Sequence, residues 1–361
     1  MTLYIRHTTD TGVRAGFSLI ELLVVIVIIS VVIAITIPAI GGARDLARGT
    51  ATQQTMTNLA NSVSSFRADE QRLPGYFNAA DMNDTMSTNG LTGMQNVLLD
   101  LAGGPTGDAD PGSTDDAFLT IDPGTGEEVV VNLNLVGAQE SGLGGYFQPE
   151  GTDYIAPEGK VAPDADVAQL PELLDAWGQP ILGWVEDEFA PEVPEEGATI
   201  ENFAQVTYAG MGDAVSRFSW QQNAGVLSSP GLGSLQDNQT EDSLLGSSET
   251  PENLELHLAA LLGSPADPVD PSGDLDGANV QDLIPGSSKG GIVFHSAGRD
   301  RIYLSRDDKG FRQLGGSFIY GRYFSPTDSA LGENPWSDAD GDQGQIDIID
   351  EFDDIVVNVA G

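Results

Sequence analysis

The sequence predicts an α+β fold in which one long N-terminal helix packs on an antiparallel β-sheet with a loop-rich periphery. Three observations support this prediction. An uninterrupted apolar run comes first, the segment after it has apolar residues spaced by three and four, and later segments are short, β-branched or aromatic, and bounded by turn residues. With 44 glycines and 20 prolines, the chain also has the composition of a protein with long loops.

The apolar run predicts a membrane-spanning helix. It extends over residues 17–40, and these 24 residues measure about 36 Å as a helix, more than a hydrocarbon core of roughly 30 Å. The segment before it carries Arg6 and Arg14 against Asp10. We therefore expect a single-pass membrane protein, with its N-terminus in the cytoplasm and its acidic bulk outside the cytoplasm.

The residues before the apolar run predict a leader that is removed. The basic stretch ends at Gly16, directly before the run, whereas a secretory signal peptide has a shorter apolar core followed by a small-residue cleavage site. We therefore expect residues 1–16 to be cut off before the helix rather than after it.

Two residues interrupt the apolar pattern. Glu21 is the one carboxylate in the run, and a charge in the bilayer centre costs about 2.5–3.5 kcal/mol on insertion scales, so we expect it to have a functional partner. A carboxylate at the membrane interface is the alternative. Pro38 lacks an N–H group and is expected to kink or locally unwind the helix, or else to end it.

The helix is expected to continue through residues 41–72 as an amphipathic segment. Its apolar residues form one face suited to packing on a sheet: Met56, Leu59, Ala60, Val63 and Phe66. Leu73-Pro74-Gly75 would end the helix.

Residues 73–361 are expected to form an acidic globular domain with insertions. Strands are predicted at 129–136, 181–185, 203–208 and 217–220. A loop-rich insertion at 231–286 surrounds one predicted helix, 251–262, in which His257 sits among polar residues. The acidic runs are predicted to be solvated surface.

The composition excludes several classes of protein. With 55 acidic and 15 basic residues the net charge is −40, so the chain would repel phosphate backbones, and no nucleic-acid partner is expected. The lack of cysteine excludes disulfides and cysteine metal sites. Three scattered histidines provide no His-rich zinc site, and neither a P-loop nor a complete dinucleotide-binding motif is present.

One motif is found in hydrolases. Gly286-Ser287-Ser288-Lys289-Gly290 fits the pattern G-x-S-x-G, in which a strained turn exposes a nucleophilic serine. The only later histidine is His295, seven residues on, whereas that fold places an acid and then the histidine farther along the chain. A membrane-anchored hydrolase using Ser288 is thus the weaker alternative, and we expect no enzyme.

The segment Gly16-Phe17-Ser18-Leu19-Ile20-Glu21, followed by a β-branched apolar run and Pro38, resembles the type IV prepilin signal. The resemblance implies a pilin-like fold, with cleavage by a prepilin peptidase between Gly16 and Phe17 and N-methylation of Phe17. It also implies that Glu21 pairs with the N-terminal amine of a neighbouring subunit during filament assembly. Physical chemistry supports such a pair, because each charge alone is costly in lipid.

Three motifs in the soluble part resemble type II secretion major pseudopilins and follow that family's order. They are Asp175-Ala176-Trp177-Gly178-Gln179-Pro180, Ser296-Ala297-Gly298-Arg299-Asp300 and Asp353-Asp354-Ile355. In the first, Gly178 permits an unusual backbone angle beside Trp177, which can anchor the turn before Pro180 in the core. The intervening segments are much longer than in that family, so the motifs support the pilin-like class more than the major-subunit class.

The same resemblance implies Ca²⁺ in the C-terminal loop, held by carboxylates at Asp300 and Asp354. Calcium takes six to eight oxygen ligands and tolerates irregular loops, so Asp338, Asp340 and Asp342 are alternate ligands. The pattern from Asp338 does not fit an EF-hand. An acidic loop that only aids solubility is the alternative.

Together these features predict a structural subunit of a type II secretion pseudopilus that aids protein export across the outer membrane. The resemblance implies as partners further copies of the chain, other pseudopilins, the prepilin peptidase and an inner-membrane assembly platform. The alternative is a major or minor pilin of a type IV pilus, serving adhesion, motility or DNA uptake. Glu21 argues against a tip subunit that lacks this carboxylate.

Overall fold

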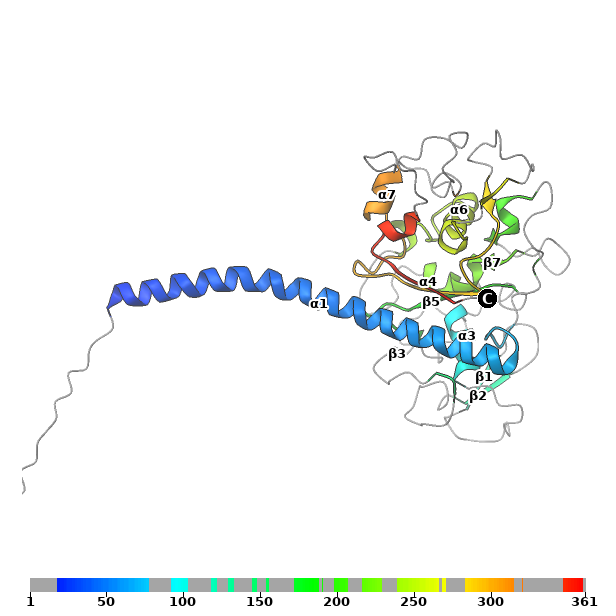
Figure 1. Ribbon diagram of the computed structural model, residues 1–361, viewed down its shortest axis with the longest axis horizontal. Helices are drawn as coiled ribbons and strands as arrows, with labels where there is room; N and C mark the ends of the chain where they lie inside the picture. Colours follow the sequence, from blue (N-terminus) through cyan, green and yellow to red (C-terminus); the bar gives the residue numbers. More distant parts are fainter. Residues whose placement is uncertain are drawn as a thin grey trace, which may run out of the picture. The chain divides into compact units, whose positions relative to one another are not determined.

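The computed structural model has the predicted α+β composition (Figure 1). It describes residues 18–77, 92–102, 118–121, 129–132, 145–147, 154–155, 172–187, 190, 198–206, 216–228, 239–265, 268–270, 283–314, 320 and 347–359. The chain divides into two compact units, residues 1–47 and residues 48–361.

The apolar run and the amphipathic segment form one helix. α1 (Leu19–Glu70) has 52 residues and is unbroken in Figure 1. Helical geometry continues through Pro38, so this residue neither ends nor unwinds the helix. α1 ends where Gln71 adopts a left-handed φ of 60°, three residues before Pro74.

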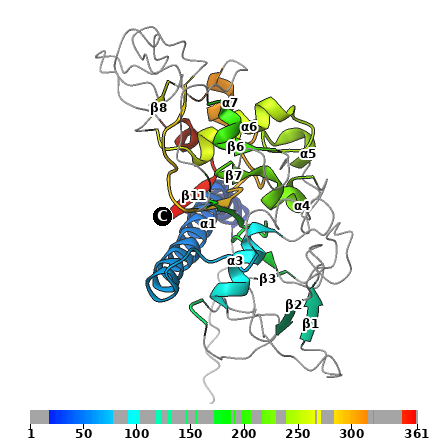
Figure 2. The ribbon, with the colours of Figure 1, turned by 90° about the vertical axis from the view of Figure 1, so that its right-hand side faces the viewer.

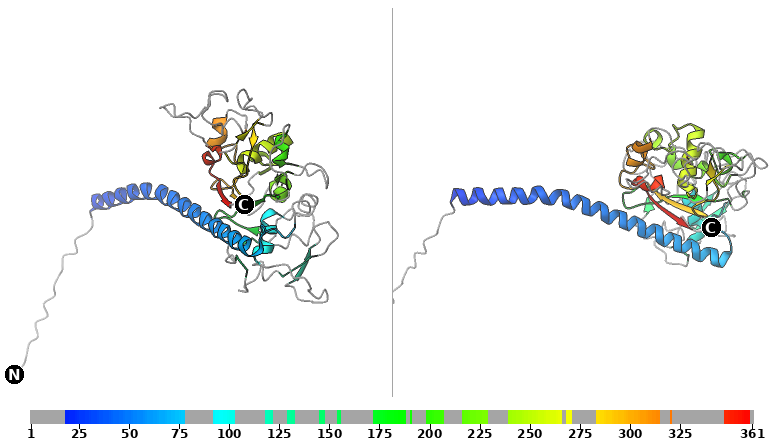
Figure 3. Two further views of the ribbon diagram at one scale, coloured as in Figure 1. Left: turned by 45° about the vertical axis from the view of Figure 1, so that its right-hand side comes forward. Right: turned by 45° about the horizontal axis from the view of Figure 1, so that its top comes forward.

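The globular unit is built on a three-stranded antiparallel sheet with the order β11–β10–β5. Its strands are β5 (Leu182–Val185), β10 (Ile292–Ser296) and β11 (Ile355–Val359). In the central strand, Phe294 lies opposite Gly183 on one side and Val357 on the other. Figure 3 shows β10 and β11 side by side, although the chain between them is long.

Both faces of this sheet are covered, because successive side chains of a strand point to opposite faces. Ile292 and Phe294 join a buried cluster with α3 (Gly93–Leu101) and the inner face of α1, formed by Met56, Leu59, Val63 and Phe66. Val293, between them in sequence, joins a second cluster with Trp184 and α6 (Pro251–Leu262). The face predicted on α1 is therefore a core face.

α6 has the predicted bounds but a different environment. The sequence places it within a loop-rich insertion, with His257 among polar residues. In the structure Leu258, Leu261 and Leu262 are fully buried, and His257 is 5% exposed. The insertion thus supplies a core helix, because the second face of the sheet needs an apolar cover.

α3 was not predicted from the sequence. Thr92 and Gln95 form a capping box at its start, a signal that is visible in the sequence. Met94, Val97, Leu98 and Leu101 have helical spacing, but the segment is short, and its polar residues Gln95 and Asn96 are buried as well. Arg72, just after α1, makes a bidentate ion pair with Asp100 of α3 at 2.6 and 3.0 Å. Figure 2 shows the ribbons of α1 and α3.

Short elements complete the described part of the chain. Paired strands are β1 (Phe118–Ile121) with β2 (Val129–Asn132), β3 (Tyr154–Ile155) with β4 (Glu172–Leu173), β6 (Ala204–Gln205) with β7 (Phe218–Ser219), and β8 (Pro268–Val269) with β9 (Ile284–Pro285). Short helices are η2 (Ile200–Asn202), η3 (Trp220–Asn223), α4 (Ala224–Leu227), α5 (Gln239–Asp242), α7 (Lys309–Leu314) and η6 (Ile348–Glu351). The predicted strands at 203–208 and 217–220 are shorter in the structure. Of the strand predicted at 129–136, residues 129–132 form β2. Residues 133–136 and 207–208 lie outside the described residues.

Candidate functional site

The first candidate site is the N-terminal part of α1. The large apolar side chains between Leu19 and Ile40 are 45% to 81% exposed. The helix is long and apolar enough to cross a membrane. A helix that is apolar all round is not stable in water, so this segment requires either lipid or the apolar faces of other helices around it.

Glu21 lies at the very start of this helix. Its Oε2 atom accepts a hydrogen bond from the backbone N–H of Ser18 at 2.8 Å, while the Ser18 carbonyl accepts one from Leu22 at 3.2 Å. The carboxylate thus satisfies one of the N–H groups that a helix start leaves unpaired, where negative charge is also favoured by the helix dipole. Gly16 and Phe17, the expected cleavage residues, lie outside the described residues.

The second candidate site begins at the turn between β4 and β5. Asp175 is 6% exposed, and its Oδ1 atom accepts backbone N–H groups from Trp177 and Gln179, both at 2.9 Å. Its Oδ2 atom accepts the Ser296 hydroxyl at 2.7 Å. Burial raises the pKa of Asp175, and these hydrogen bonds oppose that shift. The carboxylate therefore organises the turn and joins it to the end of β10.

The turn also connects elements that are distant in sequence. Trp177 is 8% exposed and Gly178 has a φ of 88°, as a turn with an aromatic anchor requires. The N–H of Ala176 donates to Thr52 Oγ1 on α1 at 3.0 Å, and the Tyr303 hydroxyl donates to the carbonyl of Pro180. The turn is therefore joined to α1 through Thr52 and, through Asp175 and Ser296, to the second of the three motifs.

The register of β10 and β11 brings the two C-terminal motifs together. Ser296, the last residue of β10, lies opposite Ile355, the first residue of β11. The residues just beyond these strand ends must be neighbours, so Asp300 and Asp353 approach each other, and the Asp300 N–H donates to Asp353 Oδ2 at 3.1 Å. Gly298, with a φ of 67°, permits this approach, since a Cβ atom there would collide with the backbone of Asp353.

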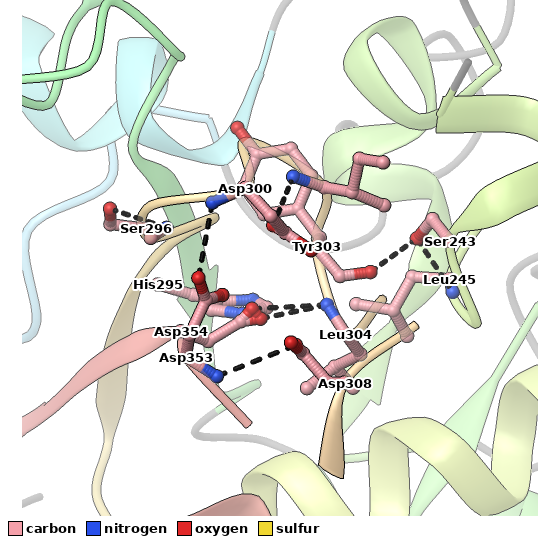
Figure 4. Close-up of polar contacts among 12 residues, drawn as sticks. Ser243, Leu245, His295, Ser296, Asp300, Tyr303, Leu304, Asp308, Asp353 and Asp354 are labelled. Atoms are coloured by element: carbon pink, nitrogen blue, oxygen red, sulfur yellow. Dashed lines mark hydrogen bonds and ion pairs between the residues drawn. The ribbon is translucent and has the colours of Figure 1, made fainter. Parts of the chain in front are cut away.

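Three carboxylates form a cluster beyond these strand ends (Figure 4). Asp300, Asp308 and Asp353 each offer one oxygen, and these oxygens lie within 4.8 Å of one another. The Asp353 N–H donates to Asp308 Oδ2 at 3.4 Å. Asp353 Oδ1 is buried and has no hydrogen-bond partner in the described part of the chain. The arrangement therefore concentrates negative charge at the ends of the two strands.

The electrostatics of this cluster fit a divalent cation. Burial, together with repulsion from neighbouring carboxylates, raises the pKa of each of the three carboxylates to about 7. A bound cation would offset both the desolvation and the repulsion. An all-oxygen, irregular donor set is what Ca²⁺ accepts. Asp308 was not among the expected ligands, although it ends a short acidic run soon after Asp300.

Asp354, an expected calcium ligand, has a different environment. Its side chain is fully buried, its two oxygens accept the Leu304 N–H at 2.7 and 3.0 Å, and Oδ1 lies 3.4 Å from His295 Nε2. Burial lowers the pKa of His295 to about 3, so its ring is neutral. Asp354 therefore holds the backbone of the loop. Asp338, Asp340 and Asp342 lie outside the described residues.

The hydrolase alternative does not match the local structure. G-x-S-x-G requires a strand, a sharp turn and then a helix, but residues 286–290 lie between the strands β9 and β10. The Ser288 hydroxyl donates to Glu186 Oε2 at 3.0 Å, while His295 lies beside Asp354. His257 Nδ1 lies 2.6 Å from the carbonyl of Leu244. Ser288 is therefore part of a structural connection.

Comparison with known proteins gives one finding. A family model described as the prokaryotic N-terminal methylation motif matches residues 13–37, which include the expected cleavage position, Glu21 and the first part of α1. No curated protein and no solved structure matches the chain.

Two glycines provide a matched test of this geometry. Both have positive φ, but a Cβ atom at Gly178 meets open space, whereas one at Gly298 meets the Asp353 backbone. Gly178→Ala should cost about 1–2 kcal/mol from backbone strain alone, and Gly298→Ala at least about 3 kcal/mol because a steric clash is added. Denaturant unfolding of the full chain in detergent, followed by tryptophan fluorescence, measures both. Equal losses would show that the strand ends do not approach as described.

Proposed function

We propose that this chain, whose methylation motif and long apolar N-terminal helix fit a type IV pilin-like protein, is a subunit of a type II secretion pseudopilus. A prepilin peptidase would cut between Gly16 and Phe17, and Phe17 would be N-methylated. α1 would then anchor the chain in the inner membrane with its globular unit in the periplasm. The observation that carries the proposal is the methylation motif, which lies on an exposed apolar helix that needs a covering.

Assembly would use the exposed segment of α1. In the membrane pool lipid covers it, and in a filament the helices of further copies and other pseudopilins would do so, where van der Waals packing drives association. An inner-membrane assembly platform would extract the subunits. Proteins that carry this motif are structural subunits, which supports a structural rather than an enzymatic role.

The choice of a secretion pseudopilus rests on the motifs of the globular unit. The Trp177 turn, the Asp300 strand end and the Asp353 pair meet around one turn and one carboxylate cluster, in the order of the type II secretion major pseudopilins that they resemble. A type IV pilus subunit with the same N-terminal motif is the competing function.

Deletion of the gene separates these two functions. Exported proteins are compared by mass spectrometry, and surface filaments by electron microscopy, in the same cells. We expect loss of exported proteins with surface filaments unchanged. Loss of surface filaments with secretion intact would instead identify a type IV pilus subunit.

Glu21 is expected to set the register between subunits by pairing with a neighbour's N-terminal amine. Glu21→Ala should leave cleavage after Gly16 intact but greatly reduce filament assembly, measured by cross-linking of subunits in membranes. Ser30→Ala is a matched control, since the Ser30 hydroxyl donates to the Ile26 carbonyl of its own helix. Normal assembly of the Glu21 variant would count against the pairing.

We further propose that the globular unit binds Ca²⁺ through Asp300, Asp308 and Asp353, with Asp354 holding the adjoining loop. Bound calcium would neutralise the cluster and fasten the loop after β10 to the start of β11. The support is the buried, unpartnered Asp353 Oδ1 and the mutual repulsion of the three carboxylates. Asp338, Asp340 and Asp342 stay predicted as alternate ligands.

Calcium should therefore raise the melting temperature. Calcium at 100 times its dissociation constant should raise it by about 5 °C at pH 8. In the folded chain these three carboxylates have pKa values of about 7, above the usual 3.8. Stability of the metal-free chain therefore falls as the pH rises from 3.8 to about 7, because the buried carboxylates ionise. At pH 5 protons compete with calcium, and the shift should be smaller.

Calorimetry of two neighbouring variants locates the effect. Asp308→Asn should abolish the calcium shift, whereas Asp307→Asn, at a side chain that is 94% exposed, should keep it. No shift in the parent chain at pH 8, or equal shifts in the two variants, would contradict the proposed site.

A further inference from the structure

The segment that carries two of the clustered carboxylates has a strained backbone. Residues 298–308 carry three aspartates and three arginines, and we call them the acidic loop after the clustered carboxylates Asp300 and Asp308. Arg301 and Leu304 have φ values of 70° and 47°, in the left-handed region that residues with a side chain rarely adopt. Such conformations persist only when the surrounding structure fixes them. The contacts that fix this loop therefore decide where Asp300 and Asp308 lie.

One side of the acidic loop is held by the C-terminal motif. The Leu304 N–H donates to both oxygens of Asp354, and the Tyr303 hydroxyl donates to the carbonyl of Pro180. Within the loop, the Ile302 N–H donates to Asp300 Oδ1 at 2.9 Å. These contacts fix one side of the loop. The backbone carbonyls of Tyr303 and Leu304 are bonded by another segment.

The other side is held by residues 241–249, which we call the clamp segment. The Leu304 carbonyl accepts the Leu244 N–H at 3.0 Å, so the strained residue is bonded from both sides. The Ser243 hydroxyl donates to the Tyr303 carbonyl at 2.5 Å and accepts the Leu245 N–H at 3.0 Å (Figure 4).

Arg306 joins the acidic loop to both ends of the clamp segment. Its backbone N–H donates to the Asp242 carbonyl at 3.0 Å and its Nε to the Glu241 carbonyl at 3.1 Å. Its guanidinium pairs with Glu249, whose side chain is only 9% exposed. One side chain therefore bonds the clamp segment at its first and last residues.

The clamp segment is itself fixed to the core. Leu244 and Leu245 are buried in the second cluster. The Leu244 carbonyl contacts His257 of α6, and the Leu245 carbonyl accepts the Trp220 indole N–H at 2.8 Å. The clamp segment that contacts the acidic loop is thus attached to the buried core.

We propose that the clamp segment presets the acidic loop for calcium, with Arg306 and Ser243 as positioning residues. This inference rests on the proposed calcium site. A loop already held in its binding geometry loses little conformational freedom when the cation binds, so affinity depends on the clamp. Outer-shell contacts of this kind typically change metal affinity by about 10-fold or more when removed.

The test compares two arginine variants by calcium titration calorimetry of the full chain in detergent. Arg306→Ala and Arg312→Ala each remove one positive charge. The Arg312 side chain pairs with the exposed Asp307 at 3.3 Å and also acts electrostatically on Asp308. Loss of charge alone would strengthen calcium binding in both variants. We expect Arg312→Ala to bind calcium as tightly as the parent or tighter, and Arg306→Ala about 10-fold more weakly.

A neutral variant and a metal-free measurement complete the design. Ser243→Ala changes no charge and should also weaken binding, and it carries the test if Arg306→Ala does not fold. In EDTA, the amide hydrogen of residue 304 should exchange faster in Arg306→Ala than in the parent. In Arg312→Ala it should exchange at the rate of the parent.

The outcomes separate the two proposals. A parent chain that binds no calcium overturns the proposed calcium site and this inference with it. A parent that binds calcium, with Arg306→Ala and Ser243→Ala binding as tightly as the parent, overturns the clamp and leaves the calcium site in place.

Discussion

The packing of one face of α1 on the β11–β10–β5 sheet is the interaction on which the rest of the structure depends. Met56, Leu59 and Val63 are fully buried there against Phe294 and its neighbours. The same helix is apolar on every side over its first turns and exposed there. One continuous element thus has to suit two environments, a protein core at one end and an apolar surrounding at the other.

The sheet also determines where the acidic cluster forms. β10 and β11 are paired so that the end of one lies opposite the start of the other, which places Asp300 beside Asp353. The inserted segment contributes to this site in two ways, since α6 covers the second face of the sheet and residues 241–249 contact the acidic loop. A segment that the sequence predicts to be a loop-rich insertion therefore contributes to the core.

The sequence was most informative where a pattern has a local physical cause. The length of the apolar run and the spacing from Met56 to Phe66 predicted α1, and Gly178 predicted a left-handed turn. β10 escaped prediction because it is buried on both faces and shows no alternation. α3 was missed although the capping box of Thr92 and Gln95 and the spacing from Met94 to Leu101 are visible in the sequence, because the helix is only nine residues long. Asp308 could not be recognised as a member of the cluster, because only the folded loop brings it to Asp353.

We propose above all that α1 becomes an assembly helix once the leader before it is removed. The most direct test is the mass of the N-terminal peptide, measured on the chain isolated from the membranes of its own cells. Mass spectrometry should find a peptide that begins at Phe17 and carries one N-methyl group. A chain that keeps residues 1–16, or one cut after the apolar run, would contradict the account.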